Sequence, residues 1–361
     1  MRFEEIREKI VNNPGFRTLR EIKEAGYRIV KERDGDRYFL IKPEELRSLL
    51  VRLGDVAEVR FGIKTGANKF FYLEPVELTV AEVMKLSERD PRALVRVKNG
   101  AGWEGEIEAE FLKPVIKSPR ECRTILLKPE DLRYLVFMCR KSKKELKGTK
   151  ALEYIQWGEK RGYHRRPTCR SRPKWWDLGI WKVPDGILPA GLNDIFRFFV
   201  NNRNILADKR MYLFYGVHEI LLFMNSTLYL LFLELGSRTG LGEGLLDLTV
   251  YEYKNVMVMP YVFKNGRKDY IQSENVEKLK STLAPFLNRP IQSIFTECGI
   301  DPESGVPISE QEPKPLPDRK ALDDLVFDVL GLTDEERKEV YRAICQLVWE
   351  RISRARSVRR R

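Results

Sequence analysis

The sequence has few of the residues that bind metal ions or form disulfide frameworks. Its 361 residues include two histidines, His164 and His218, and five cysteines that lie far apart without a C-x-x-C pair. Structural zinc sites and disulfide-stabilised secreted domains both depend on closely spaced ligands or paired cysteines. The sequence therefore argues against both classes and predicts no metal site.

Segments that would direct the chain into or across a membrane are also missing from the sequence. The amino terminus reads MRFEEIREKIV, which has no apolar core, and no apolar run reaches the roughly 20 residues of a bilayer span. Hydrophobic residues nevertheless make up 43% of the chain, enough for about two or three packed units. We expect a folded cytoplasmic protein.

Motifs for several kinds of catalysis are absent. The sequence contains no Pro-Pro pair, so it lacks the [DNS]-P-P-[YFW] loop that methylation of a base amino group requires. The Walker spacing G-x-x-x-x-G-K-[ST] is missing as well. Glycines between Gly236 and Gly244 follow an apolar helical stretch, whereas a dinucleotide or S-adenosylmethionine loop follows a strand. We therefore expect a chain that binds, with no catalytic residue and no cofactor of its own.

Positive charge is what the sequence does have, and it is concentrated. The formal net charge is +12, and residues 113–182 alone hold 20 Lys and Arg against seven Asp and Glu. The rest of the chain is therefore close to neutral. Such focusing indicates a defined electropositive face on a protein that is otherwise balanced in charge.

Residues 157–176, the basic segment, read WGEKRGYHRRPTCRSRPKWW and carry seven Lys and Arg with one acid, Glu159. Guanidinium groups interleaved with aromatic rings can contact phosphates and stack on bases, so the pattern favours nucleic acid over a merely solvated charged loop. The rings either stack on bases or form an apolar floor, and of Trp175 and Trp176 we expect one buried and one exposed. The expected DNA-binding residues here are Lys160, Arg161, Tyr163, His164, Arg165, Arg166, Arg170, Arg172, Lys174, Trp175 and Trp176.

Two further loops are expected to line the same cleft. In the first, two glycines flank Lys64 and Thr65 and are followed by Asn68, which would bring backbone amides and short polar groups close to a phosphate. The second is glycine-rich and contains Arg238 and Thr239.

The order of predicted elements divides the chain into four parts. Residues 1–52 read as helix, helix and hairpin, a small cap or, alternatively, a winged helix of a DNA-binding transcriptional regulator. Residues 53–300 mix strands and helices, which predicts an α+β domain with a mixed sheet. Residues 301–318 are Pro-rich and read as a linker, and residues 319–361 as a helical hairpin with a basic tail.

Several stretches carry a family resemblance. In order they are RFGIKTGANKFFYL, FLKPVIKSPRECRTILL, ALEYIQWGEKRGYHRRPTCRSRPKWWDL, LLFMNSTLYLLF with GSRTGLGEGLLDLTVYEYKNVMVMP, and ALDDLVFDVLGLTDEERKEVYRAICQLV. Together they resemble the carboxy-terminal half of N6-adenine DNA methyltransferases of restriction-modification systems, the large type II and IIG-like enzymes with a TaqI-like specificity domain. The resemblance covers about residues 53–358 and implies a target recognition domain that binds double-stranded DNA in a sequence-specific manner.

The sequence departs from that family in one respect. In the family the cofactor motif and the N-P-P-Y loop lie upstream, where this sequence has only residues 1–52. The resemblance therefore implies the recognition role alone. Site-specific adenine methylation, with its S-adenosylmethionine, would belong to a catalytic partner chain or domain.

Overall fold

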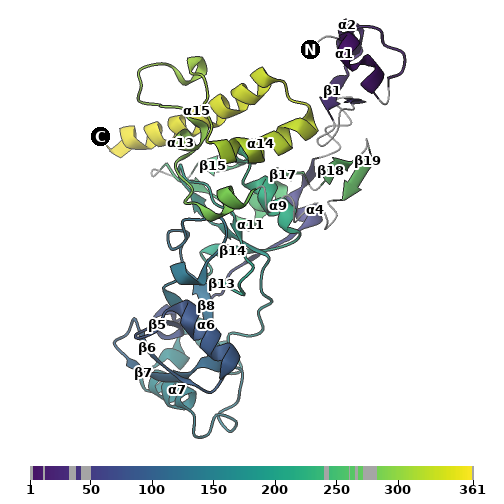
Figure 1. The fold of residues 1–361 in the computed structure, drawn as a ribbon. Helices are drawn as coiled ribbons and strands as arrows, with labels where there is room; N and C mark the ends of the chain where they lie inside the picture. The colour runs from purple at the N-terminus through teal and green to yellow at the C-terminus, as the bar shows by residue number, and fades with distance from the viewer. Residues whose placement is uncertain are drawn as a thin grey trace. The chain divides into compact units, whose positions relative to one another are not determined.

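The computed structural model describes residues 3–10, 13–31, 38–41, 50–239, 244–259, 261–264, 267–270 and 283–359. It confirms an α+β fold (Figure 1), in which contacts divide the chain into two compact units. Unit 1 consists of Met1–Glu58, Gly191–Phe198 and Gly216–Arg361, and unit 2 of Val59–Ala190 and Phe199–Tyr215. The segment 53–300, expected as one domain, thus contributes to both units, and the domain boundaries stay a prediction.

Unit 2 is built on a mixed six-stranded sheet in the order β13-β8-β9-β5-β6-β7, in which β13 and β8 are parallel and the other neighbours antiparallel. Alternation in β6 buries Val95 and Val97 and exposes the residues between them, as a strand covered on one face requires. Helix α6 (Val80–Arg89) contacts β8, and the predicted capping box of Thr79 and Glu82 starts it. The strands are β5 (Tyr72–Pro75), β6 (Leu94–Asn99), β7 (Glu104–Glu108), β8 (Leu112–Ile116), β9 (Tyr134–Phe137) and β13 (Leu206–Ala207).

A four-stranded sheet, in the order β12-β10-β14-β4, completes the sheets of unit 2. Its strands are β4 (Glu58–Phe61), β10 (Gly186–Pro189), β12 (Phe199–Val200) and β14 (Met211–Tyr215). The shorter helical elements described in this unit are α5 (Asn68–Phe71), η2 (Ala109–Phe111), η3 (Pro129–Asp131), η4 (Tyr163–Arg165) and α8 (Pro167–Arg170). Residues 70–73 read as the start of a strand in the sequence, but the strand begins at Tyr72 because residues 68–71 form a helical turn.

Residues 218–235, the most apolar stretch of the sequence, predict a buried helix interrupted at Asn225 and Ser226. Unit 1 has two apolar helices there, α9 (His218–Met224) and α10 (Thr227–Gly236), with that interruption between them. Asn225 ends α9, and its carboxamide exchanges hydrogen bonds with the backbone N–H and carbonyl of Phe198. Ser226 caps α10 by accepting from the N–H of Tyr229. In the described part of the chain no single helix is long and apolar enough to cross a membrane; α9 and α10 reach that length only together and are bent by 74°.

The amino-terminal residues form the expected helix, helix and hairpin: α1 (Phe3–Ile6), η1 (Arg7–Lys9), α2 (Leu19–Glu24), β1 (Arg28–Lys31) and β2 (Tyr38–Ile41). Their own small core is Ile6, Ile10, Ile22 and Leu40. The turn expected at residues 34–36 and the helix expected after Pro43 lie outside the described residues.

The carboxy-terminal hairpin is confirmed as α14 (Pro317–Leu330) and α15 (Asp334–Arg359), joined at Gly331. The Pro-rich segment before it is held in place: it contains η5 (Ile308–Glu310), the N–H of Lys314 donates to Cys298, and Arg342 of α15 donates to the carbonyl of Gln311. Although this segment reads as a linker by composition, it packs on α15.

The alternating side chains of residues 251–260 predict a strand in the sequence, and this prediction is wrong. The described residues there form α11 (Val250–Asn255) and then the short β17 (Met257–Val258). The capping box of Thr249 and Glu252 starts the helix and outweighs the β-prone side chains. The remaining elements of unit 1 are β3 (Val51–Arg52), α4 (Leu53–Val56), β11 (Gly191–Leu192), β15 (Arg238–Thr239), β16 (Leu246–Asp247), β18 (Tyr261–Lys264), β19 (Arg267–Tyr270) and α13 (Ile294–Cys298).

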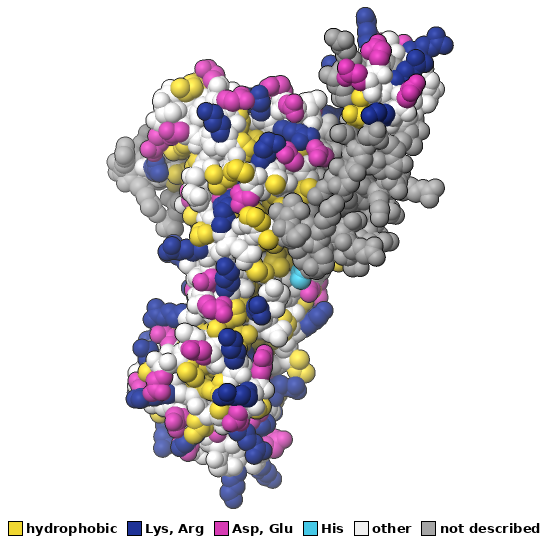
Figure 2. Space-filling model, in the orientation of Figure 1, with side chains coloured by type: hydrophobic (Ala, Val, Ile, Leu, Met, Phe, Trp, Pro, Cys, Tyr) yellow, Lys and Arg dark blue, Asp and Glu magenta, His cyan; other side chains and the backbone are white. Residues whose placement is uncertain are grey.

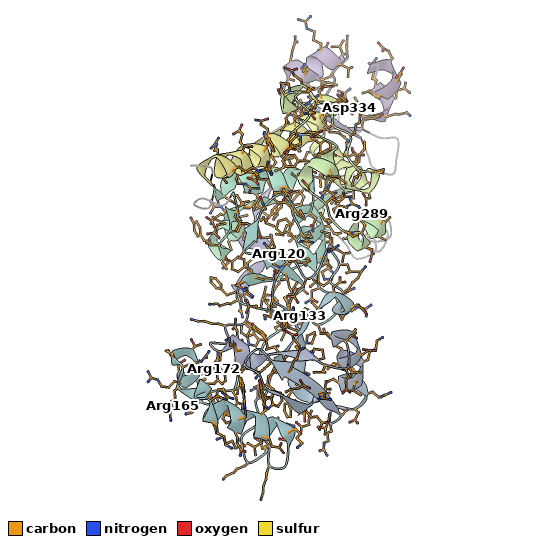
Figure 3. The ribbon with its side chains drawn as sticks, turned by 90° about the vertical axis from the view of Figure 1, so that its left-hand side faces the viewer. Arg120, Arg133, Arg165, Arg172, Arg289 and Asp334 are labelled. Atoms are coloured by element: carbon orange, nitrogen blue, oxygen red, sulfur yellow. The ribbon has the colours of Figure 1, made fainter. Side chains whose placement is uncertain are left out.

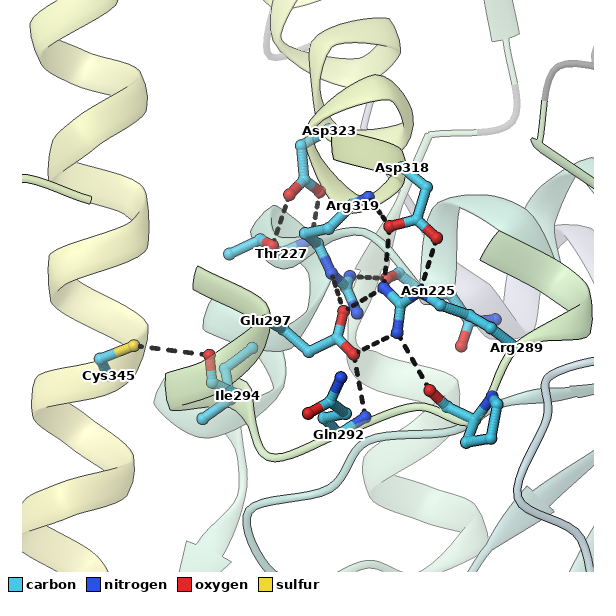
Figure 4. A network of polar contacts seen from close by, with 11 residues as sticks. Asn225, Thr227, Arg289, Gln292, Ile294, Glu297, Asp318, Arg319, Asp323 and Cys345 are labelled. Atoms are coloured by element: carbon cyan, nitrogen blue, oxygen red, sulfur yellow. Dashed lines mark hydrogen bonds and ion pairs between the residues drawn. The ribbon is translucent and has the colours of Figure 1, made fainter. Parts of the chain in front are cut away.

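A buried polar network joins α13, α14 and the junction of α9 with α10 (Figure 4). Glu297, which is fully buried, accepts from Arg289 at 2.7 Å and from Arg319 at 3.2 Å. Arg319 also donates to the carbonyl of Asn225. Asp323 accepts from the N–H and the hydroxyl of Thr227, at 2.7 and 2.6 Å. Removing one partner of such a buried pair costs about 3–5 kcal/mol, so the network fixes how these helices pack.

Asp323 makes the stability of unit 1 depend on pH. Burial raises the pKa of Asp323 from 3.8 to about 6. Because the folded protein favours the protonated form, the contribution of Asp323 to stability is complete below about pH 4 and is lost as the pH rises through about 6. Asp323→Asn stays neutral and keeps an acceptor for Thr227. Denaturant unfolding at several pH values should therefore show the wild type losing stability relative to this variant between those two pH values.

The exposed Asp334, at the start of α15, supplies the control for this experiment (Figure 3). Asp334→Asn should follow the wild-type pH profile across the same range. A constant difference between wild type and Asp323→Asn would contradict the prediction.

Candidate nucleic-acid interface

Helix α7 (Lys150–Lys160) positions the start of the basic segment. Thr149 caps it by accepting from the N–H of Leu152, and the carboxylate of Glu108, at the end of β7, accepts from the N–H groups of Lys150 and Ala151 at 2.7 and 3.0 Å. A negative carboxylate at these first amides of the helix also interacts favourably with the helix dipole. The edge strand β7 and the helix are thereby fastened to each other.

The aromatic rings of this region form a floor beneath the basic segment. The ring of Tyr154 stacks on Phe70 with centroids 4.4 Å apart and on Trp157 at 5.7 Å, and Trp175 packs against Phe70 at 4.8 Å. Tyr163, another expected DNA-binding residue, is also buried, with 5% of its surface exposed. Of the two interpretations left open by the sequence, the structure favours the apolar floor.

The expectation of one buried and one exposed tryptophan is wrong, since Trp175 and Trp176 each have 6% of their surface exposed. Each indole N–H has a partner: that of Trp175 donates to Glu159 at 3.0 Å, and that of Trp176 to the carbonyl of Lys141 at 3.3 Å. A satisfied N–H allows an indole to be buried without loss. Glu159, the one acid of the segment, therefore has a structural role that the sequence did not reveal.

Five cations of the segment are exposed above this floor. The guanidinium of Arg161 lies 5.7 Å from the ring centroid of Trp157, and that of Arg166 lies 4.6 Å from that of Tyr163. Within the described residues no ion pair or hydrogen bond engages the side chains of the other three, so their charge is available to a ligand; Arg165 points outward in Figure 3. The five are Lys160, Arg161, Arg165, Arg166 and Arg170.

Other residues that the sequence predicts to bind DNA point inward and hold the basic segment to neighbouring backbone carbonyls. Arg172 donates to the carbonyls of Lys64, at 2.6 Å, and of Trp175, at 3.3 Å, and its burial lowers its pKa. Lys174 donates to the carbonyl of Arg140 and lies 3.4 Å from Asp177. The Nδ1 atom of His164 is buried without a partner in the described structure.

The loop of residues 62–68 lies beside α8 (Pro167–Arg170), and a common site of the two stays a prediction. Thr65 is buried, with 1% exposed; its hydroxyl donates to Asn68, and its carbonyl faces the Cys169 thiol at 3.8 Å. Gly66 has φ +75°, and a Cβ there would lie 2.5 Å from the side chain of Thr168. Thr65 thus shapes the loop, while Lys64 and Asn68 are exposed on it.

Arg238 and Thr239 form β15 in unit 1, paired with β16, and their side chains lie outside the described part of the structure. Their membership of the site stays a prediction. Among the described residues no cluster of His, Cys, Asp and Glu could hold a metal ion. What the geometry brings together is the basic segment and the loop of residues 62–68. Figure 2 shows Lys and Arg side chains, with Asp and Glu among them, over the face of unit 2 that is turned to the viewer.

Comparison with known proteins places this arrangement in a family. Residues 40–285 match the family model of the carboxy-terminal domain of the type II methyltransferase M.Eco57I. The chain belongs to this family. That result confirms the resemblance to the carboxy-terminal half of restriction-modification methyltransferases. No curated protein matches the chain.

Among the solved structures, two restriction-modification enzymes are similar to this chain. The type IIG restriction endonuclease BpuSI superposes with a TM-score of 0.51 at 14% identity, over 86% of this chain and 33% of BpuSI. The type IIL restriction-modification enzyme MmeI, solved in complex with DNA, gives a TM-score of 0.44 at 14% identity, over 92% of this chain and 42% of MmeI. The chain thus spans less than half of either enzyme.

The floor and the exposed cations above it should respond differently to truncation. Trp175→Ala removes a buried ring and should lower the free energy of unfolding by about 3–5 kcal/mol. Arg165→Ala, at an exposed position, should change it by no more than about 0.5 kcal/mol. Denaturant unfolding of both variants checks this, and equal losses would show that the exposed arginine is part of the folded core's support.

Proposed function

We propose that the chain binds double-stranded DNA in a sequence-specific manner, as the target recognition part of an N6-adenine DNA methyltransferase of a restriction-modification system. The observation that carries the proposal is the row of exposed cations on a rigid aromatic floor, adjoining the loop of residues 62–68. Phosphate contacts from such cations supply affinity and set the register of a protein on a duplex.

Burial of the rings favours a duplex over a single strand. Proteins that bind single strands use exposed aromatic side chains as platforms for unstacked bases. Here Tyr163, Trp175 and Trp176 are buried and cannot take that role. The exposed guanidinium groups remain able to contact phosphates and base edges, which is what a paired duplex presents.

Methyl transfer is assigned to a catalytic domain or chain that carries the S-adenosylmethionine site. The family membership supports a methyltransferase-related role, and the sequence itself has no Pro-Pro pair for the base-binding loop. In this proposal the complex works in the cytoplasm, and the chain delivers the target adenine to its partner.

Binding of a labelled duplex should depend steeply on salt. A surface that touches about six phosphates should lose on the order of a thousandfold in affinity between roughly 50 and 200 mM salt, because condensed counterions are released on binding. Fluorescence anisotropy titrations at a series of salt concentrations measure this slope. An affinity that does not change with salt, or no binding, would overturn the proposal.

A charge-matched pair of triple variants locates the surface. Changing Arg165, Arg166 and Arg170 together to Ala should weaken binding and lower the salt slope by about three, about one per lost phosphate contact, with an unchanged melting temperature. The control changes three exposed cations around α2, which are Arg17, Arg20 and Lys23. It should bind as the wild type does. Loss of binding in the control instead would favour the winged-helix transcriptional regulator.

A further inference from the structure

A buried carboxylate lies at the end of β13 in unit 2. Asp208 is fully buried, and each of its oxygen atoms has a partner. Oδ2 accepts from the hydroxyl of Tyr72 at 2.6 Å, and Oδ1 accepts from the backbone N–H and the Nε–H of Arg210, each at 3.0 Å. Burial and the neighbouring carboxylate raise the pKa of Tyr72, so its hydroxyl stays protonated and continues to donate.

This arrangement fixes the guanidinium of Arg210 while leaving it accessible. The side chain of Arg210 is 61% exposed, whereas the Asp208 carboxylate that holds it is 0% exposed. Arg210 uses only its Nε–H and its backbone N–H to donate to Asp208. Within the described residues, the two terminal guanidinium nitrogens of Arg210 donate to no acceptor. The guanidinium is thus presented as a fork with a fixed plane, and rigid presentation lowers the entropy lost on binding.

The turn that carries Arg210 contacts the same loop as the basic segment does. The backbone of residues 207–211 lies against the loop of residues 62–68. The backbone N–H of Ile63 donates to the carbonyl of Ala207, and the backbone N–H of Lys209 donates to the carbonyl of Ile63. The approach is so close that a Cβ on Gly62 would lie 2.3 Å from the carbonyl oxygen of Asp208. The next residue of that loop, Lys64, accepts from Arg172 of the basic segment. Hydrogen bonds therefore connect the Arg210 turn to Arg172 of the basic segment through one loop.

We propose that Arg210 reads a guanine in the major groove of the bound duplex, with Asp208 and Tyr72 as the residues that position it. This inference rests on the proposed function, because it presumes a DNA duplex on this surface. The two terminal nitrogens of a guanidinium match the O6 and N7 acceptors of guanine, and this pairing is the commonest base-specific contact in protein–DNA complexes.

Phosphate is the less suitable partner for Arg210 because the carboxylate of Asp208 offsets its charge. Because Asp208 offsets part of the charge of Arg210, this pair attracts a phosphate less than a lone guanidinium would, whereas its hydrogen-bonding geometry toward a neutral base edge is kept. The adjacent Lys209 is exposed and has no acid within the described residues to offset it. Lys209 therefore fits a phosphate contact, and it supplies a matched control on the same turn.

Selection from a random duplex library with the full chain tests the proposal. The wild type should enrich a word that contains a guanine at one position read by Arg210. Arg210→Lys keeps the charge but loses the fork, so discrimination at that single position should fall by about tenfold to a hundredfold while the rest of the word is retained. Lys209→Ala should weaken binding to all sequences alike and lower the salt slope by about one, with the preferred word unchanged.

Two further measurements separate reading from support of the fold. Tyr72→Phe removes only the hydroxyl that donates to Asp208. It should lower base discrimination at the position read by Arg210 and leave the other positions of the word unchanged. A melting curve shows that this variant folds. Replacing the selected guanine by 7-deazaguanine removes N7 and should weaken the wild type but not Arg210→Ala, which has no donor for N7.

The outcomes distinguish the two proposals. A wild-type chain that binds no duplex overturns the proposed function before any variant is compared. If the wild type binds and Arg210→Lys enriches the same word with the same discrimination, the inference about Arg210 alone is overturned. An equal loss over all sequences, together with a lower salt slope, would make Arg210 a phosphate contact and would also overturn base reading.

Discussion

The stacking of Tyr154 on Phe70 is the contact on which the candidate interface depends. Tyr154 comes from α7 and Phe70 from the helical turn before β5. Their ring centroids lie 4.4 Å apart, and the angle between the two ring planes is 8°. The Tyr154 hydroxyl donates to the carbonyl of Phe70 and accepts from Asn99 at 2.9 Å. One side chain thereby joins the sheet, the helix and the aromatic floor. Because packed interiors yield little, whatever the floor carries has a fixed position.

A fixed floor is what allows so many like charges to gather on one segment. Exposed cations close together repel one another, and on a mobile loop they would spread apart. Here Trp157 and Tyr163 offer ring faces to Arg161 and Arg166, and Arg172 is tied to two carbonyls. The charge density that a polyanion meets is thus a property of the folded core. It does not arise from the loop sequence alone.

The sequence predicted the elements of this region better than their contacts. Helix α7, the capping box at Thr79 and the turn between β6 and β7 follow from local signals, and all are present. The burial of both Trp175 and Trp176 does not follow, since their hydrogen-bond partners at Glu159 and Lys141 are chosen by the tertiary fold. Composition and periodicity report exposure only on average, so a charged segment can still hide its rings.

The arginine of the Asp208 turn was not predictable for a related reason. Asp208 and Arg210 form an unremarkable D-x-R pair in sequence, and Tyr72, which completes the cluster, lies 136 residues away. The segment after Thr249 is the opposite case, because its signals were local and still conflicted. Thr249 and Glu252 form a capping box that the sequence contains, whereas the alternating side chains after it suggested a strand. Where two local signals compete, the one that satisfies backbone donors decides the structure.

The path of the chain through its two units has a consequence for how such proteins are made and how they diversify. Unit 2 is interrupted by residues 191–198, which belong to unit 1, and unit 1 is complete only once its final helices have been synthesised. Unit 2 can therefore finish folding on the ribosome first. Residues 1–58 can complete their unit only after the later residues of unit 1 have been synthesised. Exchange of unit 2 between relatives would likewise need both of its pieces to move together, because a single crossover would leave the six-stranded sheet without β13 and the four-stranded sheet without β12 and β14.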